Sequence, residues 1–246
     1  MTGMNPICRL LPSMTLPGPE QMAVDEALLE SAAAGVATLR FYRWSEPTLS
    51  LGYFQKHLDR LNDPLLTTVA WVRRSSGGGA ILHHHELTYA LAVPAGSDWN
   101  DARTWTQRMH GTIQDLLRGQ WCVCVDLCET DEVRGPFLCF DHLTPGDLTL
   151  TGLKVTGSAQ RKLRGATLQH GSVLLDTSEF TPSLPGINQL WGTGIAFDDL
   201  SDALRDRFES ETGWTLEPGT LTDAETEAMA RIVAEKYGSA VWNEKR

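Results

Sequence analysis

Residues 73–83 read Arg73-Arg74-Ser75-Ser76-Gly77-Gly78-Gly79-Ala80-Ile81-Leu82-His83, and this stretch is the strongest indication of fold and function in the chain. Two arginines run into three consecutive glycines, which remove every side chain from one length of backbone. Glycine loses more conformational freedom on folding than other residues, so the run predicts that a ligand lies directly against the main chain. The guanidinium groups favour a carboxylate, a phosphate or an acidic partner surface. A glycine-rich hairpin corner beside a surface basic pair is the alternative.

A second segment, residues 148–176, contains a hairpin and a lysine. Apolar residues alternate with polar ones on both sides of Thr151-Gly152, which predicts two strands joined by a tight turn. Period two places Lys154 on the face opposite its apolar neighbours Leu153 and Val155. A lone lysine on a strand is commonly a solvated edge charge. Small residues nearby leave room for a ligand and favour a ligand-facing lysine: Gly157, Ser158 and Gly171.

Together the two segments resemble the biotin/lipoate A/B protein ligase family, whose members include lipoate-protein ligases, octanoyltransferases and lipoyl amidotransferases. Residues 73–83 match its arginine, glycine-turn and histidine pattern, and residues 152–160 match its glycine-x-lysine and glycine-serine-alanine-glutamine elements. His170-Gly171-Ser172 matches its histidine-glycine-serine element. The resemblance covers most of residues 20–243. It implies an α+β catalytic domain with mixed β-sheets flanked by helices, of the biotin/lipoate protein ligase, class II synthetase-like architecture.

The order of predicted elements agrees with that fold class, because hairpin strands with helices at intervals differ from a nucleotide-binding βαβ series. The helices are expected at about 20–34, 101–117 (capped near Asn100), 197–212 and 221–236. The strands are expected at about 37–43, 48–52, 68–73, 79–83, 86–93, 122–127, 137–140, 147–160 and 166–175. An irregular strap is expected before Pro17-Gly18-Pro19. We expect residues 1–246 to form a single catalytic domain, with no separate C-terminal accessory domain.

Composition narrows the class of partner and compartment. The formal net charge of −10 argues against nucleic-acid or anionic-membrane binding, although a local basic patch remains open. The sequence has no apolar run of membrane-spanning length and no signal-peptide pattern. Its five cysteines are an odd number, which argues against a complete disulfide framework and favours a reducing cytoplasm.

Cys139 distinguishes between the reactions of the family. It lies in Phe137-Leu138-Cys139-Phe140-Asp141, fifteen residues before Lys154. Single-domain octanoyltransferases of the family have a nucleophilic cysteine in a similar context, and some relatives known as ligases also have Cys-Phe here. A thiolate suits thioester exchange, and a neighbouring ammonium favours the thiolate form. A small buried hydrophobe is the alternative role for Cys139.

The resemblance assigns Cys139 and Lys154 as the catalytic residues. In a transferase Lys154 would shuttle a proton and polarise the thioester carbonyl, whereas in a ligase it would contact the acyl carboxylate and adenylate phosphate. The substrate-binding residues are expected to be Arg73, Arg74, Ser76, Gly77, Gly78, Gly79, His83, Gly157, Ser158, Ala159, His170 and Gly171. Gly79 departs from the octanoyltransferases, which often have arginine here, and is more like the ligases.

No metal site is expected at His83-His84-His85. Neighbouring residues of a strand point to opposite faces, so three consecutive histidines cannot all reach one metal ion. The family resemblance places His83 at the substrate site and has an acidic residue where this chain has His84.

The first functional hypothesis is an octanoyltransferase of protein lipoylation. Cys139 would take an octanoyl (or lipoyl) group from acyl carrier protein and pass it to the specific lysine of a lipoyl domain, without a cofactor. The lipoyl-domain proteins are the glycine cleavage H protein and the E2 subunits of 2-oxoacid dehydrogenases. The second hypothesis is a lipoate-protein ligase that uses ATP and magnesium through lipoyl-adenylate. A non-catalytic acyl- or carrier-binding module is the third.

Overall fold

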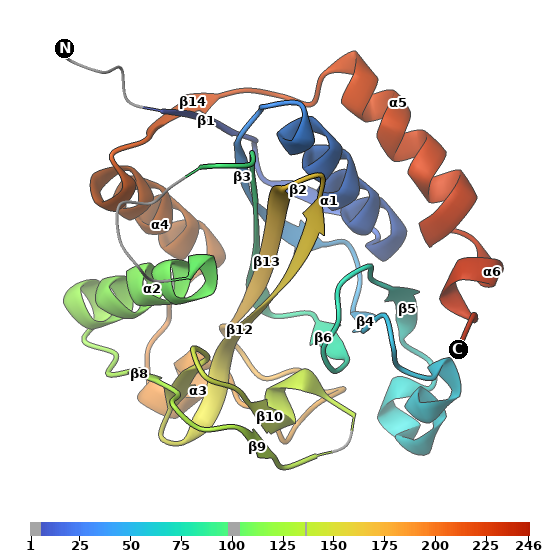
Figure 1. Ribbon diagram of the computed structural model, residues 1–246. Helices are drawn as coiled ribbons and strands as arrows, with labels where there is room; N and C mark the ends of the chain where they lie inside the picture. Colours follow the sequence, from blue (N-terminus) through green and yellow to red (C-terminus); the bar gives the residue numbers. More distant parts are fainter. Residues whose placement is uncertain (1–5, 98–103, 136) are drawn as a thin grey trace.

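The computed structural model describes residues 6–97, 104–135 and 137–246, and its main feature is a strongly twisted sheet (Figure 1). The strand order is β14-β1-β3-β7-β13-β12-β11-β8, with β2 paired to β3. These strands are β1 (Ile7–Leu10), β2 (Met14–Leu16), β3 (Thr38–Trp44), β7 (Glu86–Val93), β8 (Asp126–Leu127), β11 (Leu148–Leu150), β12 (Leu153–Leu163), β13 (Ala166–Leu174) and β14 (Thr215–Pro218). The sheet is mixed: β1 pairs in parallel with β3 and β14, whereas β3, β7, β13 and β12 are antiparallel.

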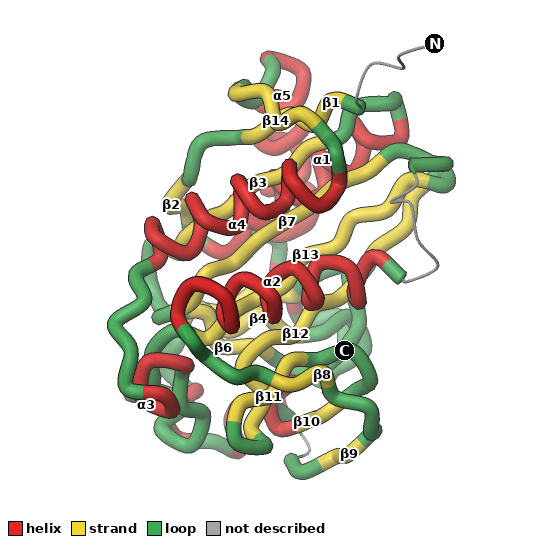
Figure 2. Tube along the Cα trace, turned by 90° about the vertical axis from the view of Figure 1, so that its left-hand side faces the viewer, coloured by secondary structure: helices red, strands yellow, loops and turns green. Residues whose placement is uncertain are grey.

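Helices cover both faces of this sheet, in accord with strands whose two faces are both apolar (Figure 2). α1 (Gly18–Ala33) and α5 (Asp223–Ile232) pack on one face, in a core that includes Leu28, Tyr42 and Ile232. On the other face α2 (Trp105–Trp121) and α4 (Phe197–Thr212) pack in a core that includes Tyr89 and Leu204. The remaining helices are α3 (Ile187–Trp191), the π-helix Val233–Tyr237 and α6 (Ala240–Asn243).

A smaller sheet carries the glycine loop. Its order is β5-β4-β6, from β4 (Thr48–Leu51), β5 (Ala70–Arg73) and β6 (Ile81–His83). Two 3-10 helices, His57–Asn62 and Pro64–Leu66, connect β4 to β5, and a third core around Leu49, Leu66 and Leu82 holds the unit together. The glycine run therefore joins the ends of β5 and β6. A third pair, β9 (Glu132–Val133) with β10 (His142–Leu143), brackets the Cys139 segment.

Most predicted elements are present with small shifts of their ends. Helix 197–212 and strand 86–93 have the predicted bounds, and the π-helix extends the helix predicted at 221–236. The α2 helix begins after Thr104, whose side chain accepts a hydrogen bond from Gln107 N and forms a capping box. The predicted cap at Asn100 lies outside the described residues. No helix of the described residues combines the length and the hydropathy needed to cross a membrane.

Three local predictions are wrong. The segment before α1 is not an irregular strap, because β1 and β2 pair with β14 and β3, which are far away in the sequence. Residues 122–125 are not a strand: Cys122 ends α2 in the left-handed conformation. Residues 137–140 are not a strand either, and a 3-10 turn begins at Cys139. In each case the deciding contact is tertiary or a chain reversal that alternation of apolar residues does not report.

Candidate active site

Cys139 lies at the start of a 3-10 turn, Cys139–Asp141, that is fastened to the end of the glycine loop. Cys139 N donates to Ala80 O at 2.7 Å, and Ala80 N donates to Phe137 O at 2.9 Å. These two hydrogen bonds form a short parallel bridge between Ala80 and Leu138. The nucleophile candidate and the glycine run, which are sixty residues apart in the sequence, are therefore one local structure.

Lys154 reaches the thiol from β12. Its Nζ lies 3.7 Å from Cys139 Sγ and donates to His142 O at 3.1 Å. The side chain is buried, which is unusual for lysine and requires compensation. Val155, which points to the other face, is also buried, so both faces of the sheet are covered at this place. Leu153, next to the Thr151-Gly152 turn, is 38% exposed. The structure brings together the two residues predicted to be catalytic.

Asp147 supplies the compensating charge, and the sequence reasoning missed it. Its Oδ2 lies 2.7 Å from Lys154 Nζ, and the two side chains are 5% and 3% exposed. Thr144 holds the same oxygen with its backbone N–H at 2.8 Å and its hydroxyl at 2.9 Å. Buried His110 donates to the neighbouring Gly146 O at 2.5 Å and fixes the turn. The sequence Thr144-Pro145-Gly146-Asp147 is typical of a turn, but it does not indicate that Asp147 pairs with Lys154.

Glycines allow close approaches at this site, and the structure gives a separate reason for each. A Cβ on Gly79 would lie 2.9 Å from Cys139 N and 3.0 Å from Phe137 O, so the nucleophile segment packs on bare main chain. A Cβ on Gly157 would lie 2.5 Å from Lys154 Cε. Gly171 makes room for the ring of Tyr89, because a Cβ on Gly171 would lie 2.5 Å from Tyr89 Cε1. Two of the three glycines therefore accommodate the two residues predicted to be catalytic.

The two arginines of the opening motif have different environments. Arg74 is buried and donates to the carbonyl oxygens of Gly77 and Gly79 at 2.8 and 2.6 Å, and to Ser50 O at 2.7 Å. Burial lowers the pKa of Arg74 to about 10, against the effect of the nearby Cys139 thiol, so the guanidinium stays charged at neutral pH. Arg74 thus places a permanent positive charge under the glycine loop.

Arg73 points the other way. Its guanidinium donates to Gly52 O, Gln55 O and Asn243 O at 3.1, 2.6 and 2.9 Å. These bonds tie the C-terminal segment to the loop after β4. Arg73 does not line the cavity described next, and its substrate-binding role stays a prediction without support from its position.

A cavity of about 290 Å³ separates the glycine loop from β12. Its lining includes seven of the predicted site residues: Arg74, Gly77, Gly78, Cys139, Gly157, Ser158 and Ala159. A narrow cavity of about 20 Å³ shares Arg74 and Ile81 with it and is lined by three more: His83, His170 and Gly171. The thiol therefore opens onto a slot floored by main chain, whose inner end is largely apolar.

Buried His83 and half-buried His170 hold the walls of this slot. A hydrogen bond of 2.7 Å joins His170 Nε2 to Ser76 Oγ in the glycine loop, and one of 3.0 Å joins its Nδ1 to Asp25 on α1. His83 bonds to Ser50 Oγ at 2.8 Å and, through its other nitrogen, to Glu86. Because both nitrogens of each ring are engaged within the protein, their positions support a role in shaping the pocket.

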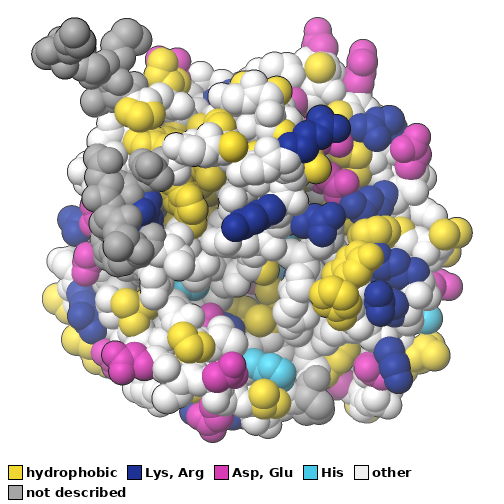
Figure 3. Space-filling model, in the orientation of Figure 1, with side chains coloured by type: hydrophobic (Ala, Val, Ile, Leu, Met, Phe, Trp, Pro, Cys, Tyr) yellow, Lys and Arg dark blue, Asp and Glu magenta, His cyan; other side chains and the backbone are white. Residues whose placement is uncertain are grey.

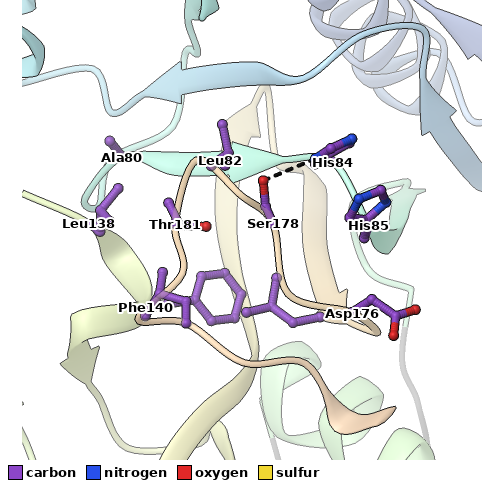
Figure 4. Close-up of a pocket in the computed structure, with 11 residues that line it drawn as sticks. Ala80, Leu82, His84, His85, Leu138, Phe140, Asp176, Ser178 and Thr181 are labelled. Carbon is purple, nitrogen blue, oxygen red and sulfur yellow. Dashed lines mark hydrogen bonds between the residues drawn. The ribbon is translucent and has the colours of Figure 1, made fainter. Parts of the chain in front are cut away.

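His84 and His85 differ from the sequence expectation. They lie in a turn rather than a strand, and their rings stack with centroids 3.5 Å apart. Figure 4 shows them beside a small cavity, which Leu138 and Phe140, the two neighbours of Cys139, line on the opposite side. Ser178 bonds to His84 Nδ1 at 3.0 Å. The argument that consecutive histidines must diverge is therefore wrong for this pair, because ligand atoms of His84, His85 and Glu179 lie within 4.8 Å of one another.

Comparison with known proteins agrees with this geometry. The family model for the lipoyl protein ligase A/B catalytic domain matches residues 17–194, which contain the glycine loop, Cys139 and Lys154. The chain belongs to this family. Octanoyltransferase LipM of Halalkalibacterium halodurans is 33% identical over 90% of this chain and 93% of its own length. Octanoyltransferase LipM of Geobacillus kaustophilus is 32% identical over 98% of this chain and 99% of its own.

Solved structures of lipoyl protein ligases confirm the predicted fold class. Lipoate-protein ligase A bound with ATP superposes with a TM-score of 0.76 at 23% identity, over 98% of this chain and 99% of that one. A bi-partite lipoate protein ligase from Thermoplasma acidophilum gives 0.70 at 20% identity, over 98% and 97%. The predicted α+β arrangement of mixed sheets and helices is that of the lipoyl protein ligase catalytic domain.

Proposed function

We propose that this lipoyl protein ligase A/B family member is an octanoyltransferase that moves an octanoyl group from a carrier thioester to a lipoyl-domain lysine. The 3.7 Å approach of Lys154 Nζ to Cys139 Sγ carries this proposal. A thiol beside a buried ammonium at the end of an apolar slot suits acyl transfer between thiols. Relatives that are octanoyltransferases over nearly their whole length support the choice of reaction.

In the first half-reaction, the Cys139 thiolate attacks the carbonyl carbon of the donor thioester. The new carbon–sulfur bond forms, the bond to the donor sulfur breaks, and the departing thiolate takes a proton from the Lys154 ammonium. The Lys154 amine then lies beside the new acyl-enzyme and Asp147 stays charged. The free amine of the acceptor lysine attacks next. Lys154 takes back the proton that this amine loses, an amide forms, and the Cys139 thiolate leaves.

This reaction needs no cofactor, because the donor thioester already holds the activated acyl group. Burying an eight-carbon chain contributes roughly 0.8 kcal/mol per methylene, which is enough for the slot to distinguish chain lengths. Lipoyl transfer between two carrier domains would use the same thiol chemistry and differ only in the donor.

The second candidate is a lipoate-protein ligase that uses ATP and magnesium. Gly79 favours it, because the ligases resembled by this sequence share glycine at this position. The same glycine also allows the close approach of Cys139, which the transferase reaction requires. Pyrophosphate exchange that requires lipoate and survives Cys139→Ala would establish the ligase reaction instead.

Intact-mass measurement after mixing with octanoyl-acyl carrier protein tests the transferase. We expect one octanoyl group on the wild-type chain, none on Cys139→Ala, and one on Cys124→Ala. Cys124 is an exposed thiol and serves as the matched control. Labelling that persists in Cys139→Ala would contradict the proposal.

We further propose that the acceptors are lipoyl-domain proteins, namely the glycine cleavage H protein and E2 subunits, and that acyl carrier protein is the donor. The bi-partite ligase neighbour belongs to a lipoylation system described together with its E2 lipoyl domain, which supports an acceptor of this kind. The free cysteines of the described residues are compatible with a cytoplasmic location. We propose that residues 1–246 act as one catalytic unit, because strands from both ends of the chain share one sheet.

A further inference from the structure

A group of cations gathers beside the cavity although the chain has a net charge of −10. Arg161, Lys245 and Arg246 form what we call the basic patch. Among the described residues, no carboxylate lies within ion-pair distance of these three side chains, whereas Lys236 nearby is paired with Glu26 at 2.6 Å. Figure 3 shows Lys and Arg side chains in a band from the tip of β12 and β13 to the C-terminal segment, along one side of a hollow.

Aromatic rings hold the C-terminal part of the patch in place. Lys245 Nζ lies 3.6 Å from the centroid of the Tyr53 ring and 3.2 Å from that of Trp242. The Arg246 guanidinium lies over Tyr53 and over Phe54, which is 70% exposed. Contacts of this kind orient a cation without neutralising it. The charges are therefore fixed and still available to a partner.

The cations are close enough to repel one another. Burial lowers the pKa of Lys245 to about 8, and Arg73, Lys236, Arg246 and Arg161 act in the same direction. Like charges that are held together destabilise the isolated protein, and an anionic partner would relieve this repulsion.

The patch borders the mouth of the active-site slot on two sides. Gln160 lines the cavity, and the exposed Arg161 follows it directly on β12. On the other side, Tyr53 N donates to Ser76 O at 2.9 Å, next to the glycines that line the slot. A molecule lying on the patch would thus be in reach of Cys139.

We infer that the basic patch docks the acyl donor, an acidic carrier protein whose thioester hangs on a phosphate-bearing arm. This inference rests on the proposed function and names where the donor binds. The donor must deliver its thioester to Cys139 through the slot, so an anionic arm would lie along the mouth where Arg161 and Lys245 stand. Arginine and lysine side chains at the opening of the slot are suited to binding a phosphate group.

The test compares two octanoyl donors with the Arg161→Glu/Lys245→Glu variant. One donor is octanoyl-acyl carrier protein, and the other is octanoyl-N-acetylcysteamine, which is small and uncharged. We expect KM for the carrier protein to rise about tenfold or more with kcat nearly unchanged, because rim charges act chiefly on encounter. Turnover of the small thioester should stay within about twofold, and added salt should raise KM of the wild type more than that of the variant.

The control variant is Arg205→Glu, at a half-buried position of α4, which should leave the KM of both donors unchanged. An unchanged KM for the carrier protein overturns the inference. Equal losses with both donors overturn it as well, because the residues would then shape the slot. A rise in KM for the acceptor domain alone would assign the patch to the acceptor. If the wild type forms no acyl-enzyme with either donor, the proposed function itself fails.

Discussion

The Lys154–Asp147 ion pair allows stability and chemistry to be measured separately. The two charged groups lie 2.7 Å apart and are almost completely buried. Removing one member of a buried pair leaves an uncompensated charge and costs about 3–5 kcal/mol. Lys154→Met keeps most of the side-chain volume and leaves the carboxylate with its two donors from Thr144. Because those hydrogen bonds remain, we expect a loss of about 2–4 kcal/mol in the free energy of unfolding.

Asp147→Asn should reverse most of that loss when the two changes are combined. The double variant Asp147→Asn/Lys154→Met has no buried charge at this place, and its amide can still accept from Thr144. We expect its unfolding free energy to lie within about 1 kcal/mol of the wild type, so the effects of the two changes are strongly non-additive. Urea unfolding followed by tryptophan fluorescence measures all four proteins. Lys162→Met, an exposed lysine on the same strand, is the matched control.

The acylation rate of the double variant should stay low although its unfolding free energy recovers. Rapid-quench intact-mass measurement with octanoyl-acyl carrier protein should give a rate lower by about 10²–10⁴-fold for Lys154→Met and for the double variant. Asp147→Asn should lie between these and the wild type, because it keeps the ammonium but loses its anchor. A Lys154→Met protein as stable as the wild type, or a double variant less stable than Lys154→Met, would refute the ion-pair reasoning. Fast acylation by the double variant would remove Lys154 from the chemistry.

Three further variants follow from the same contacts. Gly79→Ala places a Cβ 2.9 Å from Cys139 N, so unfolding free energy should fall by about 1–3 kcal/mol and acylation should be lost; urea unfolding and intact mass measure both. Gly157→Ala meets the flexible end of Lys154, so the acylation rate should fall with stability within about 1 kcal/mol of the wild type. Burial raises the pKa of Glu225, but hydrogen bonds from an arginine of β1 and other donors outweigh it and set the pKa at about 2. Its folded pKa is thus below its unfolded value of about 4.5, so Glu225→Gln should cost about 1–3 kcal/mol above pH 4.5; this difference should fade toward pH 2, and a constant difference in unfolding measured across that range would contradict the assignment.

Local patterns in the sequence predicted the elements whose own residues specify them. The apolar positions of α1, with the stop at Gly35, and the strand pattern of β7 predicted their type and their approximate bounds. The sequence also predicted the hairpin turn at Thr151-Gly152. In the structure both residues have the positive φ values that such a turn requires. The family motifs added the pairing of Cys139 with Lys154, which periodicity alone does not give.

The partners across the fold were decided by tertiary structure. β1 and β14 are short segments without a strong pattern, and each becomes a strand because the other lies beside it. Asp147 belongs to no motif. It contacts Lys154 because β11 and β12 pair as an antiparallel hairpin, which brings the residue before β11 next to Lys154. The two arginines of the opening motif have identical chemistry in the sequence. Neighbouring backbone carbonyls direct Arg74 under the glycine loop and Arg73 toward the C-terminal segment.

By itself the sequence determined which chemical groups are available and the local conformations that short stretches prefer, since both depend on neighbouring residues. Tertiary structure decided which charge neutralises which, and where the basic patch lies relative to the slot. The physical reason is that burial and electrostatic interaction depend on distance in space, and the chain brings residues 53, 161 and 245 together only when it is folded.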